Sequence, residues 1–381
     1  MSKKVITSEF VSYGHPDKIA DQISDAILDA FLIFDTNVRT GIEVMVKDNV
    51  VVLGGEVNSK AHVDYDNIVR SVFSKLNFPK SHHLNPENIK IINLIGQQSP
   101  EIHNGVDRGE DVIGAGDQGF VVGFATNETP EFMPLGYYIA KKICQYVSSG
   151  IGEDFGPDVK SQVVVEYDDD NNSSVIKSIL VSSMHQCSID DARRIIRNAI
   201  LNNWCGIDEK IFNKYIDGRI DITINPCGTW NIGGPISDCG VTGRKIVVDQ
   251  YGGYCNVGGG AFSGKDMTKV DRSAAYMARY LAKNIVANGV ADTAKVEIAY
   301  MIGVPEPVAL NIELNRNEDK INAIKEFILS NVDITPSGIM KRFKHEVPRY
   351  EYVSAHGHFG DTLNDRLVYP WEITDLKIDI S

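Results

Sequence analysis

The sequence has no apolar run of about 18 residues, and no apolar segment follows its first lysines, so it predicts neither a transmembrane helix nor a secretory signal peptide. It is also poor in positive charge, because 38 Lys and Arg stand against 51 Asp and Glu, a formal net charge of −13. Such an acidic surface excludes general binding to nucleic acid or to an anionic membrane. A local basic cluster can still hold a small anion.

Cysteine is scarce, and no two cysteines have the CxxC spacing of a zinc ribbon or a thioredoxin-like motif. The sequence therefore predicts reduced thiols in a cytoplasmic protein. The hydrophobic content of 43% and charged content of 23% are typical of a globular chain, and 381 residues suffice for two or three domains. The six cysteines are Cys144, Cys187, Cys205, Cys227, Cys239 and Cys255.

One order of elements occurs three times: a helix, two strands joined by a tight turn, and a second helix. This order is typical of α+β units whose helices cover one face of a sheet, although an ordinary α+β chain can give it by chance. The expected helices span 17–34, 66–76, 135–148, 191–204, 271–288 and 319–331. The expected strands span 42–46, 50–53, 162–167, 175–181, 295–302 and 308–314.

The repeat predicts an α+β fold of three similar helix–hairpin–helix units, each an α/β sandwich, related by a pseudo-threefold axis. We place the units at residues 3–101, 113–231 and 233–371, and expect the structural domains to be discontinuous and to exchange segments. Glycine-rich, aperiodic segments lie between the repeats, the largest from Gly233 to Gly264. Loops of this length in a compact domain are usually functional.

The first motif that carries chemistry is Gly-His-Pro-Asp-Lys at residues 14–18, where the first helix begins. A helix start attracts phosphate through its free N–H groups, and His15 and Lys18 are expected to strengthen this field. Asp17 can bind a divalent metal that itself binds phosphate. The alternative is that Asp17 only caps the helix and His15 lies on the surface.

A pair of carboxylates forms the second motif. If Asp48 and Asn49 make a two-residue turn, Glu43 lies opposite Gly54, and Glu56 projects from the same sheet face as Glu43. Two neighbouring acids favour a cation between them, because like charges repel. A solvated polar face is the alternative.

A glycine-rich loop at residues 259–266 forms the third motif. It matches GxxxxGK, but Asp266 stands where a P-loop needs Ser or Thr, and residues 251–258 do not predict a buried strand. We therefore expect a glycine-lined anion loop ending in Lys265, not a true P-loop. Cations interleaved with acids in this region are typical of a Mg²⁺–polyphosphate site, with solvated surface as the alternative. These residues are Asp238, Arg244, Lys245, Lys265, Lys269 and Asp271.

Asp158 and Lys160 form a fourth candidate pair at the entry to the second hairpin. Strand alternation predicts that both side chains face the same way. An exposed ion pair of little energetic value is the alternative.

Together these motifs resemble the S-adenosylmethionine synthetase (methionine adenosyltransferase) family over nearly the whole chain, from Thr7 to about Trp371. The sequences at residues 14–18, 114–119 and 258–266 carry the resemblance. It implies that ATP, L-methionine and water give S-adenosylmethionine, phosphate and pyrophosphate through a tripolyphosphate intermediate. It also implies a homotetramer, a dimer of dimers with active sites at the dimer interface. The polar segment from Gln98 to Gly109 resembles a loop that gates the site.

The resemblance also implies roles for individual positions. The residues expected to act on the reacting phosphates are His15, Lys160, Arg244, Lys245 and Lys265. The further ATP contacts are Asp158, Thr229, Trp230, Asp238 and Ala261. The methionine-side residues are Glu56, Gln98, Asp117, Asp238, Lys265 and Lys269. The metal ligands are Asp17 and Asp271 for two Mg²⁺ per site, and Glu43 for one K⁺.

Four positions depart from the family pattern: Tyr13 replaces a usual Glu, Gln97 replaces a common Lys, and Thr229 and Trp230 replace a usual Arg-Phe pair. Trp230 can still stack on adenine, whereas Thr229 removes a charge. Two other functions stay open: a different Mg²⁺-dependent phosphoryl-transfer ATPase, and a catalytically silent nucleotide-binding or regulatory subunit of the same fold.

Overall fold

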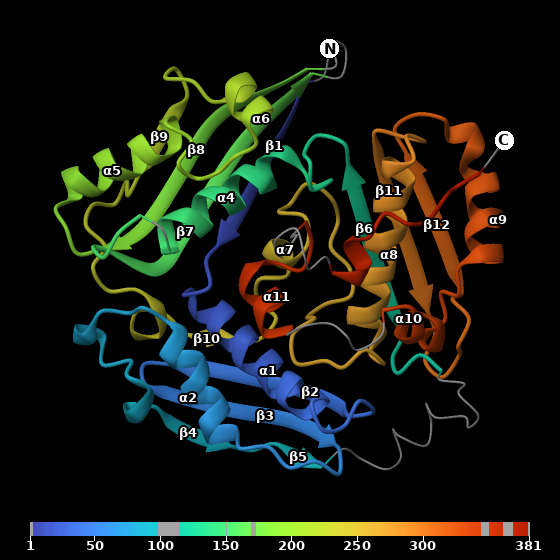
Figure 1. Cartoon of the computed structure of the whole chain (residues 1–381), viewed down its shortest axis with the longest axis horizontal. Helices are drawn as coiled ribbons and strands as arrows, with labels where there is room; N and C mark the ends of the chain where they lie inside the picture. Colours follow the sequence, from blue (N-terminus) through green and yellow to red (C-terminus); the bar gives the residue numbers. More distant parts are fainter. Residues whose placement is uncertain are drawn as a thin grey trace.

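The computed structural model describes residues 3–97, 114–149, 151–168, 173–343, 350–360 and 369–379. Three separate sheets surround a centre that holds α7 (Ile246–Asp249) and α11 (Tyr350–His356) (Figure 1). Each sheet is built on one of the three predicted hairpins. No helix in the described part of the chain is both long and apolar enough to cross a membrane.

The first sheet confirms the predicted turn, because Lys47 pairs with Val50 across Asp48 and Asn49. Asp48 has φ 52°, the left-handed conformation that such tight turns require and that Asp tolerates. Apolar residues of the hairpin, such as Val44, are buried beneath the helices (Figure 1). The elements are α1 (Pro16–Leu32), β2 (Arg39–Lys47), β3 (Val50–Asn58), α2 (Tyr65–Lys75), β4 (Lys90–Asn93) and β5 (Gly96–Gln97).

The second sheet has the order β1-β7-β8-β9, with α4 packed against β7 and β1. Valines and isoleucines such as Val163 and Ile179 are buried on the face that the helices cover. The elements are β1 (Lys3–Val11), α4 (Leu135–Ser149), β7 (Phe155–Asp168), β8 (Ser173–His185), α5 (Ile189–Leu201), α6 (Glu209–Tyr215) and β9 (Asp221–Ile224).

The third sheet has the order β12-β11-β6, and α8 packs against β6 and β11. Gly123 of β6 permits this contact, because a Cβ there would lie 2.0 Å from a backbone carbon of α8. The elements are β6 (Gly119–Thr126), α8 (Val270–Ala287), β11 (Thr293–Tyr300), β12 (Ala309–Leu314), α9 (Ile321–Asn331) and α10 (Pro336–Arg342).

Each hairpin takes an edge strand from a distant part of the chain. β1 pairs with β7, β6 pairs with β11, and β10 (Gly240–Val241) pairs with β2. The exchange is cyclic: the first sheet receives a strand from residues beyond 233, the second from the N-terminus, and the third from the segment after residue 113. No sheet can therefore be completed by one third of the chain.

All six predicted helices and all six predicted strands are present, with ends shifted by a few residues. The three exchanged strands are not predicted. β1 alternates buried Ile6, Ser8 and Phe10, and its buried serine obscures an apolar period of two. β6 directly follows a glycine-rich segment, and β10 has only two residues, so neither gives a strand signal.

Candidate functional site

The N-terminus of α1 is capped by His15, whose Nδ1 accepts a hydrogen bond from the Asp17 backbone N–H at 3.1 Å. Burial, together with the charges of Lys245 and Lys160, lowers the pKa of His15 to about 3. The imidazole is therefore neutral at physiological pH and adds no positive charge. This corrects the expectation that His15 strengthens the field; its Nε2 can still donate or accept a hydrogen bond.

Asp17 does not cap the helix. Its Oδ1 accepts from the Val241 backbone N–H at 2.9 Å, and its Oδ2 pairs with Lys245. Gly240 allows this close approach, because a Cβ there would lie 2.1 Å from the Pro16 carbonyl oxygen. The exchanged strand β10 thus brings Lys245 to the start of α1.

Lys18 points away from this group, which is a second correction. Its side chain is 0% exposed, and its Nζ donates to Asp21 at 2.9 Å and to Asp249 at 2.5 Å. Its charge is therefore taken up by carboxylates in the interior. Asp21 is a local partner on the same helix, whereas Asp249 is 231 residues away and gives no local signal.

Asp158 is buried, and its Oδ2 accepts from the Gly234 backbone N–H at 2.7 Å. Its Oδ1 is buried without a hydrogen-bond partner among the described residues. Burial raises the pKa of Asp158 to about 6, although Gly234 and Lys160 oppose the rise. This carboxyl group is thus positioned with one oxygen available to a ligand.

Lys160 is exposed, whereas Asp158 and Val159 are both buried. The strand has a register irregularity between Phe155 and Val159, and the shared direction of the two side chains stays a prediction. Asp158 and Lys160 nevertheless interact electrostatically. Neither Lys160 nor the exposed Arg244 forms a hydrogen bond or ion pair through its side chain within the residues that the structure describes, so both cations are available to an anion.

A second group of charges gathers at the start of α8. Lys265 Nζ pairs with Asp271 Oδ2 at 2.5 Å, and the Lys265 backbone forms an isolated bridge with Gly41 of β2. Gly264 makes the contact with β2 possible: it has φ +82°, and a Cβ would lie 2.0 Å from the Ile42 carbonyl oxygen.

The predicted carboxylate pair belongs to this second group. Glu43 pairs with Gly54 and Glu56 with Gly41, so the two acids share a face as predicted. Burial raises the pKa of Glu43, Lys265 opposes the rise, and the charges of Asp21 and Glu56 add to it. Glu43 therefore lies within the electrostatic reach of Lys265.

The structure therefore gathers most predicted site residues into two groups, which we call the α1 group and the α8 group. The α1 group contains His15, Asp17, Asp158, Lys160, Asp238 and Lys245. The α8 group contains Glu43, Glu56, Lys265 and Asp271. No hydrogen bond or ion pair joins the two groups among the described residues, although Gly243, two residues before Lys245, lies against Ala261.

The other predicted residues that the structure describes belong to neither group. Lys269 pairs with buried Asp266 at 3.0 Å, and Asp117 is exposed next to Gly116, which lies against Thr268. Thr229 is exposed, and the indole N–H of Trp230 donates to the Ile232 carbonyl at 2.7 Å. Gln98 and the loop to Gly109 lie outside the described residues.

The carboxylates of the two groups are the candidate metal ligands. Across the described ranges, no three or more His, Cys, Asp and Glu side chains are grouped as a complete metal site. Asp17 and Asp271 each offer a carboxylate at a helix start. This fits Mg²⁺, which binds through one or two carboxylates and completes its shell with waters and substrate phosphates.

Comparison with known proteins gives a consistent result. Three family models match: the N-terminal domain of S-adenosylmethionine synthetase at residues 3–100, the central domain at 112–230 and the C-terminal domain at 232–373. The S-adenosylmethionine synthase of Borreliella afzelii is 41% identical over 384 residues, covering 98% of this chain and 96% of the relative. That of Brachyspira hyodysenteriae is 40% identical over 392 residues, covering 97% and 96%.

A solved structure also matches over nearly its full length. It is described as an unusual S-adenosylmethionine synthetase from Campylobacter jejuni, with a TM-score of 0.85, 35% sequence identity and 97% of each chain covered. Its fold is therefore the three-domain fold of this chain. The family models, the relatives and the structure agree, and the chain belongs to the S-adenosylmethionine synthetase family.

Proposed function

We propose that this methionine adenosyltransferase joins ATP and L-methionine, with the α1 and α8 groups surrounding the polyphosphate. The methionine sulfur attacks C5′ of the ribose, the C5′–O bond breaks, and tripolyphosphate leaves and is hydrolysed to phosphate and pyrophosphate. The observation that carries the proposal is a set of incompletely neutralised cations beside two helix starts. Lys160 and Arg244 have no side-chain partner among the described residues. Lys245 and Lys265 each pair with one carboxylate.

The chemistry needs positioning and charge stabilisation more than a base. A thioether is neutral and already nucleophilic, so no side chain has to remove a proton from it. The difficulty is the charge that develops on the leaving polyphosphate, and fixed cations act on this charge without reorganising. Neutral His15 can contribute a hydrogen bond, and the free Oδ1 of Asp158 can accept one from the nucleotide.

For the remaining positions we propose the family roles. Thr229, Trp230, Asp238 and Ala261 would contact ATP, with Trp230 stacking on adenine. The methionine-side residues would be Glu56, Gln98, Asp117, Asp238, Lys265 and Lys269.

The family is metal-dependent, and we propose two Mg²⁺ and one K⁺ per site. Asp17 and Asp271 would hold Mg²⁺, and Glu43 would hold K⁺. Bound Mg²⁺ would neutralise phosphate charge and release Lys245 and Lys265 from their present carboxylate partners. We expect EDTA-treated, metal-free enzyme to be inactive and to recover with Mg²⁺. Full activity without metal would contradict the roles of both aspartates.

We further propose a homotetramer, a dimer of dimers, in which the α1 group of one subunit meets the α8 group of its partner. The β2 face that carries Glu43 also exposes Met45, 42% of whose surface is accessible, and none of the described helices covers this face (Figure 1). The cyclic strand exchange supports a pseudo-threefold relation of three domains near residues 3–101, 113–231 and 233–371.

The products distinguish this function from its alternatives. Purified protein is incubated with ATP, Mg²⁺ and K⁺, with and without L-methionine, and the products are identified by mass spectrometry. Methionine-dependent formation of S-adenosylmethionine supports the proposal. Methionine-independent ADP formation would indicate another ATPase, and binding without turnover would indicate a silent subunit; either result would overturn it.

A further inference from the structure

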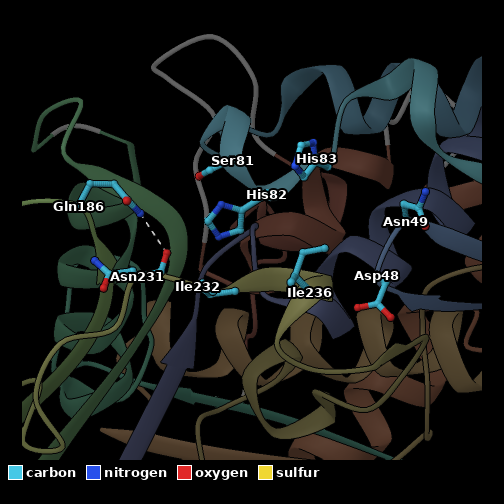
Figure 2. A pocket seen from close by; sticks show the side chains of 9 residues that line it. All are labelled: Asp48, Asn49, Ser81, His82, His83, Gln186, Asn231, Ile232 and Ile236. Atoms are coloured by element: carbon cyan, nitrogen blue, oxygen red, sulfur yellow. Dashed lines mark hydrogen bonds between the residues drawn. The ribbon is translucent and has the colours of Figure 1, made fainter.

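A pocket of about 500 Å³ lies outside both groups, between the first and second sheets (Figure 2). It forms where the β2–β3 turn meets the short helical turn Lys80–His82 and the segment that follows Trp230. Its volume falls in the range of about 300–1,000 Å³ that small-molecule sites occupy. Of the described residues proposed to bind ATP, methionine or metal, none lines it.

His82 is the unusual residue of this pocket. It is only 5% exposed, yet neither ring nitrogen has a hydrogen-bond partner among the described residues. Figure 2 shows its ring in the middle of the pocket, between Gln186 on one side and Asn49 on the other. Burial lowers the pKa of His82, so the ring is neutral and offers one donor and one acceptor. Buried polar groups are nearly always paired, and this pair of atoms therefore points to a bound molecule.

The amides around His82 are oriented so that their oxygens remain available. The nitrogens donate to backbone carbonyls: Asn49 to Asn88 at 2.9 Å, Gln186 to Asn231 at 2.9 Å (dashed in Figure 2), and Asn231 to His185 at 2.8 Å. Within the described part of the chain, the three side-chain oxygens accept no hydrogen bond. The pocket is therefore rich in acceptors and suits a ligand that carries donors.

The lining offers little to hold a phosphate. Asp48 contributes a carboxylate that pairs with Lys47 at 2.6 Å, and no Lys or Arg is among the described residues that line the pocket. Two isoleucines add apolar surface: Ile232 lies near Asn231, and Ile236 lies towards Asp48 (Figure 2). A planar, uncharged molecule with an exocyclic amine and ring nitrogens matches both the amide oxygens, which accept hydrogen bonds, and the two nitrogens of His82.

We propose that this pocket binds an uncharged aminopurine, as the free base or the nucleoside, at a site separate from the ATP site. Adenosine is the probe. It is titrated calorimetrically into the full chain, with Mg²⁺ and a non-hydrolysable ATP analogue at saturation so that the ATP site is filled. Adenosine binds under these conditions, and AMP binds about tenfold more weakly or worse, because no Lys or Arg among the described lining residues holds its phosphate.

Two variants locate the binding. His82→Leu removes both nitrogens at similar bulk and weakens adenosine binding about tenfold or more. Ile232→Trp fills the pocket from an exposed position and abolishes binding, so the test does not depend on whether His82→Leu folds. The matched control is His62→Leu, at an exposed histidine away from the pocket, which leaves binding unchanged. Synthesis of S-adenosylmethionine continues in all three variants.

Three results would overturn the proposal. One is the absence of adenosine binding to the wild type. Another is displacement of adenosine by the ATP analogue, which would place it in the ATP site. The third is equal adenosine affinity in the wild type and Ile232→Trp.

Discussion

The interior and the site of this protein contain the same kinds of charged side chains in different states. Lys18 and Arg272 have 0% exposed side chains and donate to carboxylates that are themselves buried. Lys245 and Lys265 each have 23% exposed side chains and pair with one carboxylate. The second pair keeps donors that a polyphosphate can use. The degree of neutralisation, and not the residue type, thus separates structural cations from those proposed to bind the substrate.

The starts of two helices each place a site residue next to an interior cation in the sequence. α1 carries Asp17 followed by Lys18, and α8 carries Asp271 followed by Arg272. Successive residues on a helix point about 100° apart, so each aspartate reaches the site while its neighbour enters the interior. Both interior cations then pair with aspartates of α1, Lys18 with Asp21 and Arg272 with Asp25. The same core network therefore fixes the starts of both helices.

The largest expected effect is on stability. Arg272→Met leaves Asp25 buried without its bidentate partner, whose hydrogen bonds measure 2.7 and 2.8 Å. We expect the free energy of unfolding to fall by about 3–5 kcal/mol, measured by urea denaturation. Lys3→Ala, which removes an exposed partner of Glu166, serves as the control and should leave the urea midpoint unchanged. An equal, small effect of both substitutions would remove the distinction between interior and surface pairs.

Lys265→Ala tests the role proposed for the partly exposed cations of the site. It removes a cation proposed to oppose the leaving charge, so kcat should fall by ~10²-fold or more while the urea midpoint changes little. Lys295→Ala is the matched control: Lys295 is similarly exposed, at 18%, and is paired with Glu297 and Glu313. Near-normal turnover in Lys265→Ala would exclude this lysine from the mechanism.

Asp29 provides a pH-dependent test of the interior. Burial raises its pKa to about 7, although the backbone N–H groups of Glu351 and Tyr350 donate to it. A carboxyl group with a raised folded-state pKa stabilises the fold at low pH, and this contribution is lost as pH rises through about 4 to 7. Between pH 5 and pH 8, wild type should lose about 2–3 kcal/mol relative to Asp29→Asn. A pH-independent difference in the free energy of unfolding would refute this.

The smallest effect is expected at Thr229, which is exposed and stands where the family resemblance implies an arginine. Thr229→Arg should lower the KM for ATP by about two- to fivefold, the size expected of one exposed ion pair, and leave kcat unchanged. Steady-state kinetics at varied ATP concentration provide the measurement, with Thr229→Gln as the uncharged control. An equal effect of Arg and Gln would show that charge at this position is irrelevant.

The sequence was sufficient for the elements and for one geometric detail of the site. Apolar periodicity identified the helices and hairpins, and the two-residue turn correctly placed Glu43 and Glu56 on one face. Local patterns could not reveal the exchanged strands, because pairings such as Gly240 with Val46 join residues almost two hundred positions apart.

The burial, charge and partners of the titratable side chains also could not be predicted from the sequence. His15 and Lys18 belong to the same motif, but burial makes His15 neutral, whereas Lys18 lies between two carboxylates. Asp158 is buried and Lys160 is exposed, although strand alternation predicts a similar environment for both. Such outcomes depend on long-range packing, which decides desolvation and partners together.

The most direct test of the account is a crystal structure with Mg²⁺, L-methionine and a non-hydrolysable ATP analogue. We expect the triphosphate to lie between Lys245 and Lys265, with metal ions on Asp17 and Asp271 and the methionine sulfur facing C5′. A triphosphate bound away from these four side chains would contradict the account.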